Sequence, residues 1–326
     1  MRKLLLLAGF LIVTAALPAG AVVPTTAHET AIETAITSAV SQNSHPPMLN
    51  PSLATLATPL GIYNAQGSSL QWKCDPQTVV ALRTAPKPCW FGAIKGPTWV
   101  VFGDSNAGSW LPALDVAAKT LGVRLASFVY PGCTSRTVVS KFESVTISAP
   151  CSQFHSHLAA AVGALKPTVV ISATLGEGFS GNNSNVDVDA YAATWKATFD
   201  AVTASAPRAK RLLFETTPNM GGTTSIPECL SQHKDLLSCS PHYYPGNYYS
   251  TNYWMYLQLT KNAAAASNAT LVNVAQWFCQ TGLRLMNECP AAIGSTLVYV
   301  DGDHISQVYM KQIAPALVDE LKALGF

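Results

Sequence analysis

The sequence of 326 residues has few charged side chains and no excess of either sign. Lys, Arg, Asp and Glu together make up 12% of it. Without Arg2 and Lys3, which precede an apolar run, 18 basic side chains face 18 acidic ones. Nucleic-acid binding or docking on an anionic membrane needs a basic surface, which this balance does not supply. We therefore expect no nucleic-acid partner and a neutral substrate, such as a sugar or an ester.

Long hydrophobic runs are absent beyond the N-terminus. The one long run extends from Leu4 to about Leu17, follows two basic residues and precedes the small residues Ala19-Gly20-Ala21. Because roughly 20 apolar residues are needed to cross a bilayer, the run predicts a cleaved signal peptide over residues 1–21, with an uncleaved membrane anchor as the alternative. Later runs are interrupted by Pro, Gly or polar residues. We expect a soluble mature protein that is secreted or extracytoplasmic.

The eight cysteines show no metal-binding spacing. No Cys-x-x-Cys occurs and the histidines are scattered, so we expect no metal ion. In an exported chain, eight cysteines favour disulfides. Each cysteine has a near neighbour across a loop rich in Pro or Gly, which favours nearest-neighbour pairing among the many alternatives. The predicted bridges are Cys74–Cys89, Cys133–Cys151, Cys229–Cys239 and Cys279–Cys289.

Aromatic residues are scarce between Val22 and about Ser69, where Ala, Thr, Ser and Pro dominate. Such a composition buries little apolar surface. We interpret residues 22–71 as an N-terminal extension with one short helix near Glu29–Val40. Whether it is a linker or an arm packed on the main domain stays open. Residues 72–326 suit a single large domain without internal repeats.

From about Trp72 onward, short apolar runs alternate with segments of helical periodicity. This alternation is typical of a parallel sheet covered by helices on both faces. We predict a three-layer α/β/α sandwich with a mainly parallel, doubly wound sheet of roughly five strands. The expected strands are 98–102, 124–130, 168–172, 211–216 and 270–274, and the expected helices are 109–121, 151–165, 191–204, 253–266 and 306–324.

A candidate nucleophile follows the first expected strand. Ser105 ends the tripeptide Gly103-Asp104-Ser105, and ligands of open α/β sheets bind beyond the carboxyl ends of the strands. A serine hydroxyl needs a base that accepts its proton. His304 lies just before the last helix, and Asp301, three residues earlier, can orient its imidazole. We expect Asp303 to have a structural role in the turn, because its adjacent position makes contact with the imidazole awkward.

In combination, these motifs resemble the SGNH/GDSL hydrolase superfamily over about Trp72 to Phe326. The resemblance is closest to the SGNH domains of bacterial membrane acyltransferases that O-acylate surface glycans, where a cysteine pair precedes a Tyr-x-Asp-x-x-His-Leu-Ser signature. Here Cys279 and Cys289 precede the segment 299–306, which reads Tyr-Val-Asp-Gly-Asp-His-Ile-Ser. The resemblance implies an SGNH-like fold, a Ser105–His304–Asp301 triad, and a membrane acyltransferase as a partner.

The resemblance also implies an oxyanion hole, whose donors face the charge of a tetrahedral intermediate. The N–H groups of Ser105 and Gly132 are candidates, and an ordinary turn is the alternative for Gly132. The family's Gly-x-Asn-Asp block has no counterpart after the third strand, where the sequence reads Ala-Thr-Leu-Gly-Glu-Gly over 173–178. An amide near Gly176, or the side chain of Asn182 or Asn183, could substitute, or the hole is incomplete.

Other polar and aromatic residues receive weaker assignments. Tyr243 and Tyr244 lie in a tyrosine-rich loop that could stack on sugar faces or pack against the sheet edge. We expect Trp110 in the core, and His155 and His157 on a solvated helix face.

The sequence therefore predicts a serine esterase or O-acyltransferase that acts on acyl esters of a small molecule or an O-acylated glycan. The expected acyl group is acetyl, and the expected intermediate is an acyl-serine. No cofactor is expected, and the protein is predicted to be a monomer. A non-catalytic glycan-binding module on a decayed SGNH scaffold is the alternative, motivated by the missing asparagine.

Overall fold

The computed structural model describes residues 25–42, 44–74, 87–136, 149–173, 187–218, 225–232, 235–243, 248–280 and 287–326. The predicted signal peptide therefore lies outside the described residues. Within them, no helix is long and apolar enough to cross a bilayer.

A six-stranded sheet forms the centre of the fold, in the order β1-β3-β2-β4-β5-β7. Five of its strands confirm the predicted parallel set and are parallel to their neighbours. The sixth, β1, pairs antiparallel with β3 at the sheet edge, so the prediction of about five strands was one short. With only four residues, β1 is too brief for a visible alternation of apolar and polar residues. The strands are β1 (Cys89–Gly92), β2 (Thr98–Gly103), β3 (Arg124–Val129), β4 (Val169–Ala173), β5 (Lys210–Phe214) and β7 (Thr270–Val272).

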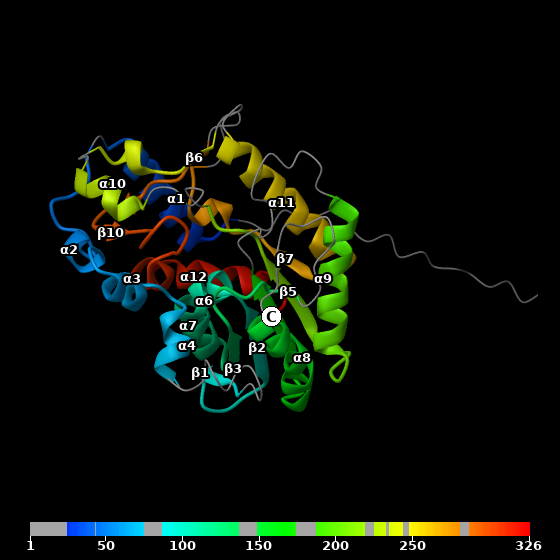
Figure 1. Ribbon diagram of the computed structural model, residues 1–326. Coiled ribbons are helices and arrows are strands. Elements are labelled where there is room, and N and C mark those ends of the chain that lie inside the picture. Colours follow the sequence, from blue (N-terminus) through cyan, green and yellow to red (C-terminus); the bar gives the residue numbers. More distant parts are fainter. Residues whose placement is uncertain are drawn as a thin grey trace, which may run out of the picture.

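Helices cover both faces of this sheet, as predicted (Figure 1). Along β2, Val100 and Phe102 join one core while Trp99 and Val101 join the other, because successive strand side chains point to opposite faces. One core contains residues of α8 (Ala149–Ala164), α9 (Val188–Thr203) and the later part of α11 (Tyr248–Ala266). The other contains residues of α7 (Leu111–Leu121) and α12 (Gln307–Ala323). All five predicted helices are present, with α11 beginning five residues early.

Several short helices and two small strand pairs lie outside the central sheet. They are the helices α2 (Leu53–Leu56), α3 (Pro59–Ala65), α4 (Ser69–Cys74), α6 (Ser105–Ser109) and α10 (Ile226–Gln232), and the strand pairs β6 (His242–Tyr243) with β8 (Asn287–Glu288) and β9 (Ala292–Ile293) with β10 (Thr296–Leu297).

The N-terminal helix α1 (Ala27–Val40) packs on α12. Thr26 caps it through a reciprocal capping box with Glu29. Ile36 and Ala39 are fully buried in the core that contains α12. This part of the predicted extension is thus an arm on the main domain, not a free linker.

Three of the predicted disulfides are present: Cys133–Cys151, Cys229–Cys239 and Cys279–Cys289. Cys89 is also disulfide-bonded. The side chain of Cys74, its predicted partner, lies outside the described part of the chain.

Candidate active site

Ser105 is the first residue of α6 and lies two residues beyond the end of β2. Asp104 caps this helix, because its Oδ1 accepts hydrogen bonds from the N–H groups of Asn106 and Ala107 at 2.8 and 3.0 Å. Gly103 has φ +142°, a conformation that side chains disfavour. The Gly-Asp-Ser tripeptide thus forms a tight strand-to-helix turn that leaves Ser105 half-buried at the carboxyl end of the sheet.

His304 lies in the loop before α12, with two carboxylates at one ring nitrogen. Its Nδ1 is 2.8 Å from Asp301 Oδ2. The other Asp301 oxygen accepts hydrogen bonds from the N–H groups of Asp303 and His304 at 2.9 and 2.7 Å. This carboxylate therefore both shapes the loop and orients the imidazole, as expected for the third member of a triad.

Asp303 does not match the expectation of a purely structural role. Its Oδ1 lies 3.0 Å from the same Nδ1 of His304. The turn closed by Asp301 folds the chain back on itself, so adjacent side chains converge. Ligand atoms of Asp301, Asp303 and His304 lie within 4.8 Å of one another, a spacing that could hold a cation. The same atoms already contact one another, since Nδ1 of His304 lies within 3.0 Å of both carboxylates.

The two carboxylates control the charge of the ring. Burial alone would lower the pKa of His304, but the hydrogen bonds and negative charges of Asp301 and Asp303 outweigh it and raise this pKa to about 10. Burial alone would raise the pKa of Asp301, but its hydrogen bond to His304 and the imidazolium charge bring this pKa down to about 2. Both shifts favour the imidazolium–carboxylate form of this pair.

A short N-terminal segment, Gln66–Ser69, connects the two halves of the site. Gln66 forms a bridge with Ser306, two residues after His304. Gly67 is buried against α6: a Cβ there would lie 2.5 Å from the carbonyl oxygen of Ser109. Ser109 in turn donates its hydroxyl to the carbonyl of Ser105, one helical turn earlier. Residues that are nearly two hundred positions apart thus contact the same four-residue segment.

The hydroxyl of Ser105 and the imidazole of His304 are not hydrogen-bonded to each other. Nε2 of His304 is buried and has no hydrogen-bond partner among the described residues. In substrate-free sites such bonds are often long and tighten only in the complex. The carboxylate and imidazole of the predicted triad are therefore in contact, and within the described part of the chain no other group binds the nitrogen that would serve the serine.

Two of the predicted oxyanion donors lie at neighbouring strand ends. Gly103 aligns with Val129 and with Ala173, so β2, β3 and β4 end side by side. Beyond β3, Tyr130-Pro131-Gly132-Cys133 forms a tight turn in which Cys133 N–H donates to the Tyr130 carbonyl at 3.0 Å. Gly132 has φ +73°, the value that the third position of a type II turn requires. The N–H of Gly132 donates to no acceptor among the described residues.

Several predicted site residues cannot be placed. Gly176, Asn182, Asn183 and Tyr244 lie outside the described residues. The backbone of Tyr243 belongs to β6, whereas its side chain is not described.

The expectation for His155 was wrong, whereas those for His157 and Trp110 were correct. His157 is exposed, and Trp110 is buried edge-to-face against Phe214. His155, in contrast, is 8% exposed, and its Nε2 lies 2.8 Å from the Thr134 carbonyl oxygen. Phe154, Leu158 and Val162, each four residues after the last, mark the buried face of this helix, and His155 lies on it next to Phe154.

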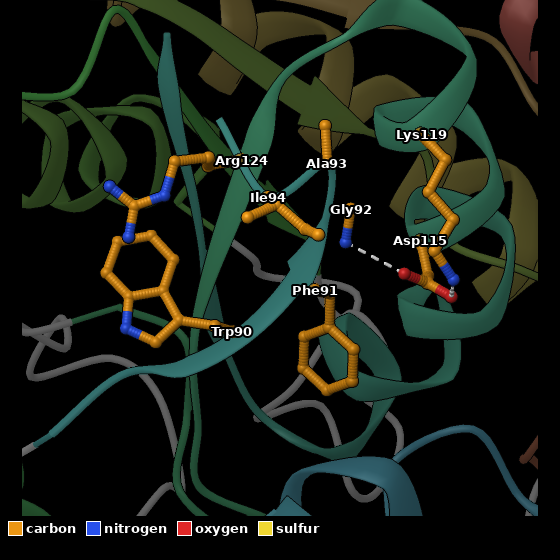
Figure 2. Close-up of a pocket in the computed structure, with 8 residues that line it drawn as sticks. All are labelled: Trp90, Phe91, Gly92, Ala93, Ile94, Asp115, Lys119 and Arg124. Atoms are coloured by element: carbon orange, nitrogen blue, oxygen red, sulfur yellow. Dashed lines mark hydrogen bonds and ion pairs between the residues drawn. The ribbon is translucent and has the colours of Figure 1, made fainter. Parts of the chain in front are cut away.

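A separate hollow lies at the opposite end of the sheet (Figure 2). Arg124, the first residue of β3, stacks its guanidinium 3.9 Å from the ring centre of Trp90. On the other side of β1, the Gly92 N–H donates to Asp115 at 2.8 Å. Because Arg124 begins β3 whereas the candidate site follows its end, this hollow is not the active-site crevice.

Comparisons with known proteins agree with this fold. A family model described as the SGNH domain fused to AT3 domains matches residues 73–319. The periplasmic domain of a Salmonella ser. Paratyphi A lipopolysaccharide acetyltransferase has a similar fold, with a TM-score of 0.53 and 11% identity over 82% of this chain and 99% of that chain.

Two further solved structures are more distant. A Corynascus thermopiles (Myceliophthora fergusii) carbohydrate esterase family 2 enzyme with a carbohydrate binding domain has a TM-score of 0.38 and 16% identity, over 71% of this chain and 68% of that chain. A GDSL-like lipase from Parabacteroides merdae has a TM-score of 0.40 and 12% identity, over 72% and 99%. No curated protein sequence matches the chain. Because the family model covers most of its length, the chain belongs to the SGNH family, in the group of SGNH domains fused to AT3 domains, and is an enzyme that acts on ester bonds.

Proposed function

We propose that this protein is an extracytoplasmic serine esterase or O-acyltransferase that acts on acetyl esters of a glycan. The observation that carries the proposal is the Asp301–His304 pair, 2.8 Å apart, whose second imidazole nitrogen makes no hydrogen bond to any described residue. The segment Gln66–Ser69 contacts both the loop of this pair, at Ser306, and the last residue of α6, the short helix that begins at Ser105.

In the proposed reaction, Oγ of Ser105 attacks the ester carbonyl carbon while neutral His304 takes the hydroxyl proton. The carbonyl oxygen becomes an oxyanion, which the N–H groups of Ser105 and Gly132 stabilise. The C–O bond to the leaving alcohol breaks, and His304 returns the proton to that alcohol. An acyl-serine remains, and water or a sugar hydroxyl attacks its carbonyl carbon while His304 takes the attacking group's proton. The bond between the acyl carbon and Oγ of Ser105 then breaks, and His304 returns the proton to Oγ.

The choice of a glycan acetyl ester rests on likeness. The matched domain family is fused to AT3 domains, and the similar solved structure is named a lipopolysaccharide acetyltransferase periplasmic domain. Disulfides in the described chain support an oxidising compartment outside the cytoplasm. A membrane acyltransferase is the partner that the family description favours.

The nucleophile is tested with p-nitrophenyl acetate and a fluorophosphonate probe. Wild type should hydrolyse the ester and carry the probe on Ser105, whereas Ser105→Ala should lose both. Ser156→Ala, an exposed serine on α8, is the control and should retain labelling of Ser105. Folded wild type without labelling or turnover would overturn the proposal and favour a glycan-binding module.

Hydrolysis and transfer are separated by mass spectrometry of an acetylated oligosaccharide incubated with an unacetylated one. Transfer adds 42 Da per acetyl group, roughly the mass of a ketene unit, to the acceptor, whereas hydrolysis only removes it from the donor. Loss from the donor without gain by the acceptor assigns the protein as an esterase.

A further inference from the structure

We propose that Ser135 is a positioning residue. It holds three segments in one arrangement: the strand-to-helix turn Gly103–Ser105 (the nucleophile turn), the turn Tyr130–Cys133 that contains Gly132, and the end of β4. This inference rests on the proposed function. Ser135 lies three residues beyond Gly132 and is 1% exposed. It has no place in the motifs that identify the nucleophile and its base.

Its hydroxyl joins two strand ends. Oγ accepts a hydrogen bond at 3.2 Å from the N–H of Asp104, the residue directly before Ser105. The same oxygen donates its proton to the carbonyl of Ala173, the last residue of β4, at 2.7 Å. One hydroxyl therefore satisfies a buried donor on one strand end and a buried acceptor on the next.

The surrounding packing leaves this oxygen little freedom. A Cβ on Gly103 would lie 2.4 Å from Ser135 Oγ, 2.7 Å from the Ala107 side chain and 3.2 Å from the Ala173 carbonyl oxygen. Glycine at 103 is thus required to let the backbone approach the hydroxyl. Asp104 is held at both ends, since its N–H binds Ser135 and its carboxylate caps α6.

The loop that carries Ser135 is itself fixed. Cys133 is bridged to Cys151 on α8, and His155, one turn later on that helix, binds the Thr134 carbonyl at 2.8 Å. These two contacts fix the loop to α8. Ser135 in turn connects the loop to the nucleophile turn through its hydrogen bond with Asp104. The donors of an oxyanion hole come from separate strands, and a misplacement of about 1 Å can cost about 100-fold in rate.

The test compares Ser135→Ala with Ser240→Ala. Ser240 is an apt control because it is equally buried, accepts from the N–H of Ala291 at 2.8 Å and donates to the Leu236 carbonyl at 2.8 Å. Both variants lose one buried hydroxyl with the same two roles, so both should show a similar fall in Tm. Only Ser135→Ala should lower kcat for p-nitrophenyl acetate, by up to about 100-fold, with KM little changed.

A second readout and a conservative variant separate positioning from stability. Ser135→Ala should slow fluorophosphonate labelling of Ser105, whereas Ser135→Thr, which keeps the hydroxyl, should restore both rates. If Ser135→Ala does not fold, Ser135→Cys keeps the volume with a weaker hydrogen bond and should show the same loss. Active wild type with unchanged kcat and labelling in folded Ser135→Ala or Ser135→Cys overturns this inference alone, while inactive wild type overturns the proposed function.

Discussion

Asp303 lies 3.0 Å from Nδ1 of His304, at the same ring nitrogen that Asp301 binds at 2.8 Å. Two carboxylates on one nitrogen stabilise the imidazolium more than one would. In the proposed reaction the general base must be neutral to accept a proton, so the raised pKa of His304 should move activity toward alkaline pH.

We therefore expect kcat/KM to rise with pH toward about 10, the pKa of His304. Asp303→Asn removes one of the two negative charges that raise this pKa, so the rising limb should move to lower pH by about one unit or more. The pH profile of kcat/KM for p-nitrophenyl acetate measures this displacement. Asp189→Asn, an exposed carboxylate on α9, should leave the midpoint in place, and an unmoved midpoint in Asp303→Asn would contradict the role given to Asp303.

Asp301→Asn should lower kcat by about 100 to 10,000-fold, because the amide no longer fixes the ring tautomer or stabilises the imidazolium. Single-turnover release of p-nitrophenol from folded variant measures the acylation step directly. A loss below tenfold would mean that Asp303 alone can orient His304, and the Asp301→Asn/Asp303→Asn pair would then reveal it.

The same pair makes the stability of the fold depend on pH. The pKa of His304 is raised above 6.5, so its stabilisation is present below about pH 6.5 and is lost as pH rises through about 10. The pKa of Asp301 is lowered from 3.8, so its stabilisation is present above about pH 4 and is lost as pH falls through about 2. The Tm difference between wild type and Asp301→Asn should be largest between about pH 4 and 6.5 and shrink toward pH 10. A difference that is constant across thermal melts at these pH values would rule out this linkage.

Gln307 joins the last helix to the N-terminal segment. Its amide nitrogen lies 2.8 Å from the Asn64 carbonyl oxygen, 2.9 Å from that of Gln66 and 3.0 Å from Ser69 Oγ. Gln307→Ala should lower kcat by about 10 to 100-fold, because His304 lies three residues away on the loop that this contact holds. Gln312→Ala, at an exposed position of the same helix, is the matched control and should change neither kcat nor Tm. Equal kinetics in the two variants would show that the segment is dispensable for catalysis.

Removal of the Cys133–Cys151 bridge should affect stability and rate together. The double serine variant should lose about 2 to 4 kcal/mol of unfolding free energy, because the unfolded chain gains freedom. A double serine variant of Cys229–Cys239 should lose a comparable amount. At a temperature at which both are folded, only the first should show a lower kcat, since its bridge anchors the loop of Gly132 and Ser135. Equal kcat in the two variants would show that the Cys133–Cys151 bridge does not hold the site in place.

The parallel core of the fold was predictable because its strands are apolar runs and its helices have clear spacing. The edge strand β1 was not, since four residues carry no period. Asp301 and His304 could be paired from their spacing in one loop. The contact of Asp303 depends on how Asp301 closes the turn through two backbone N–H groups, and the link of Ser135 to Asp104 joins positions 31 residues apart. Neither leaves a local pattern in the sequence.

Gly67 has a consequence for how the chain can be shortened. The family match begins at residue 73, yet the glycine wedged against Ser109 and the contacts of Gln66 and Ser69 with the last helix precede that point. A protein trimmed to residues 73–319 would keep every motif residue. It would nevertheless lose the segment that contacts both α6 and α12, and the surfaces that this segment covers would be exposed to water. For this chain, the structural unit that supports the candidate site begins upstream of the matched domain.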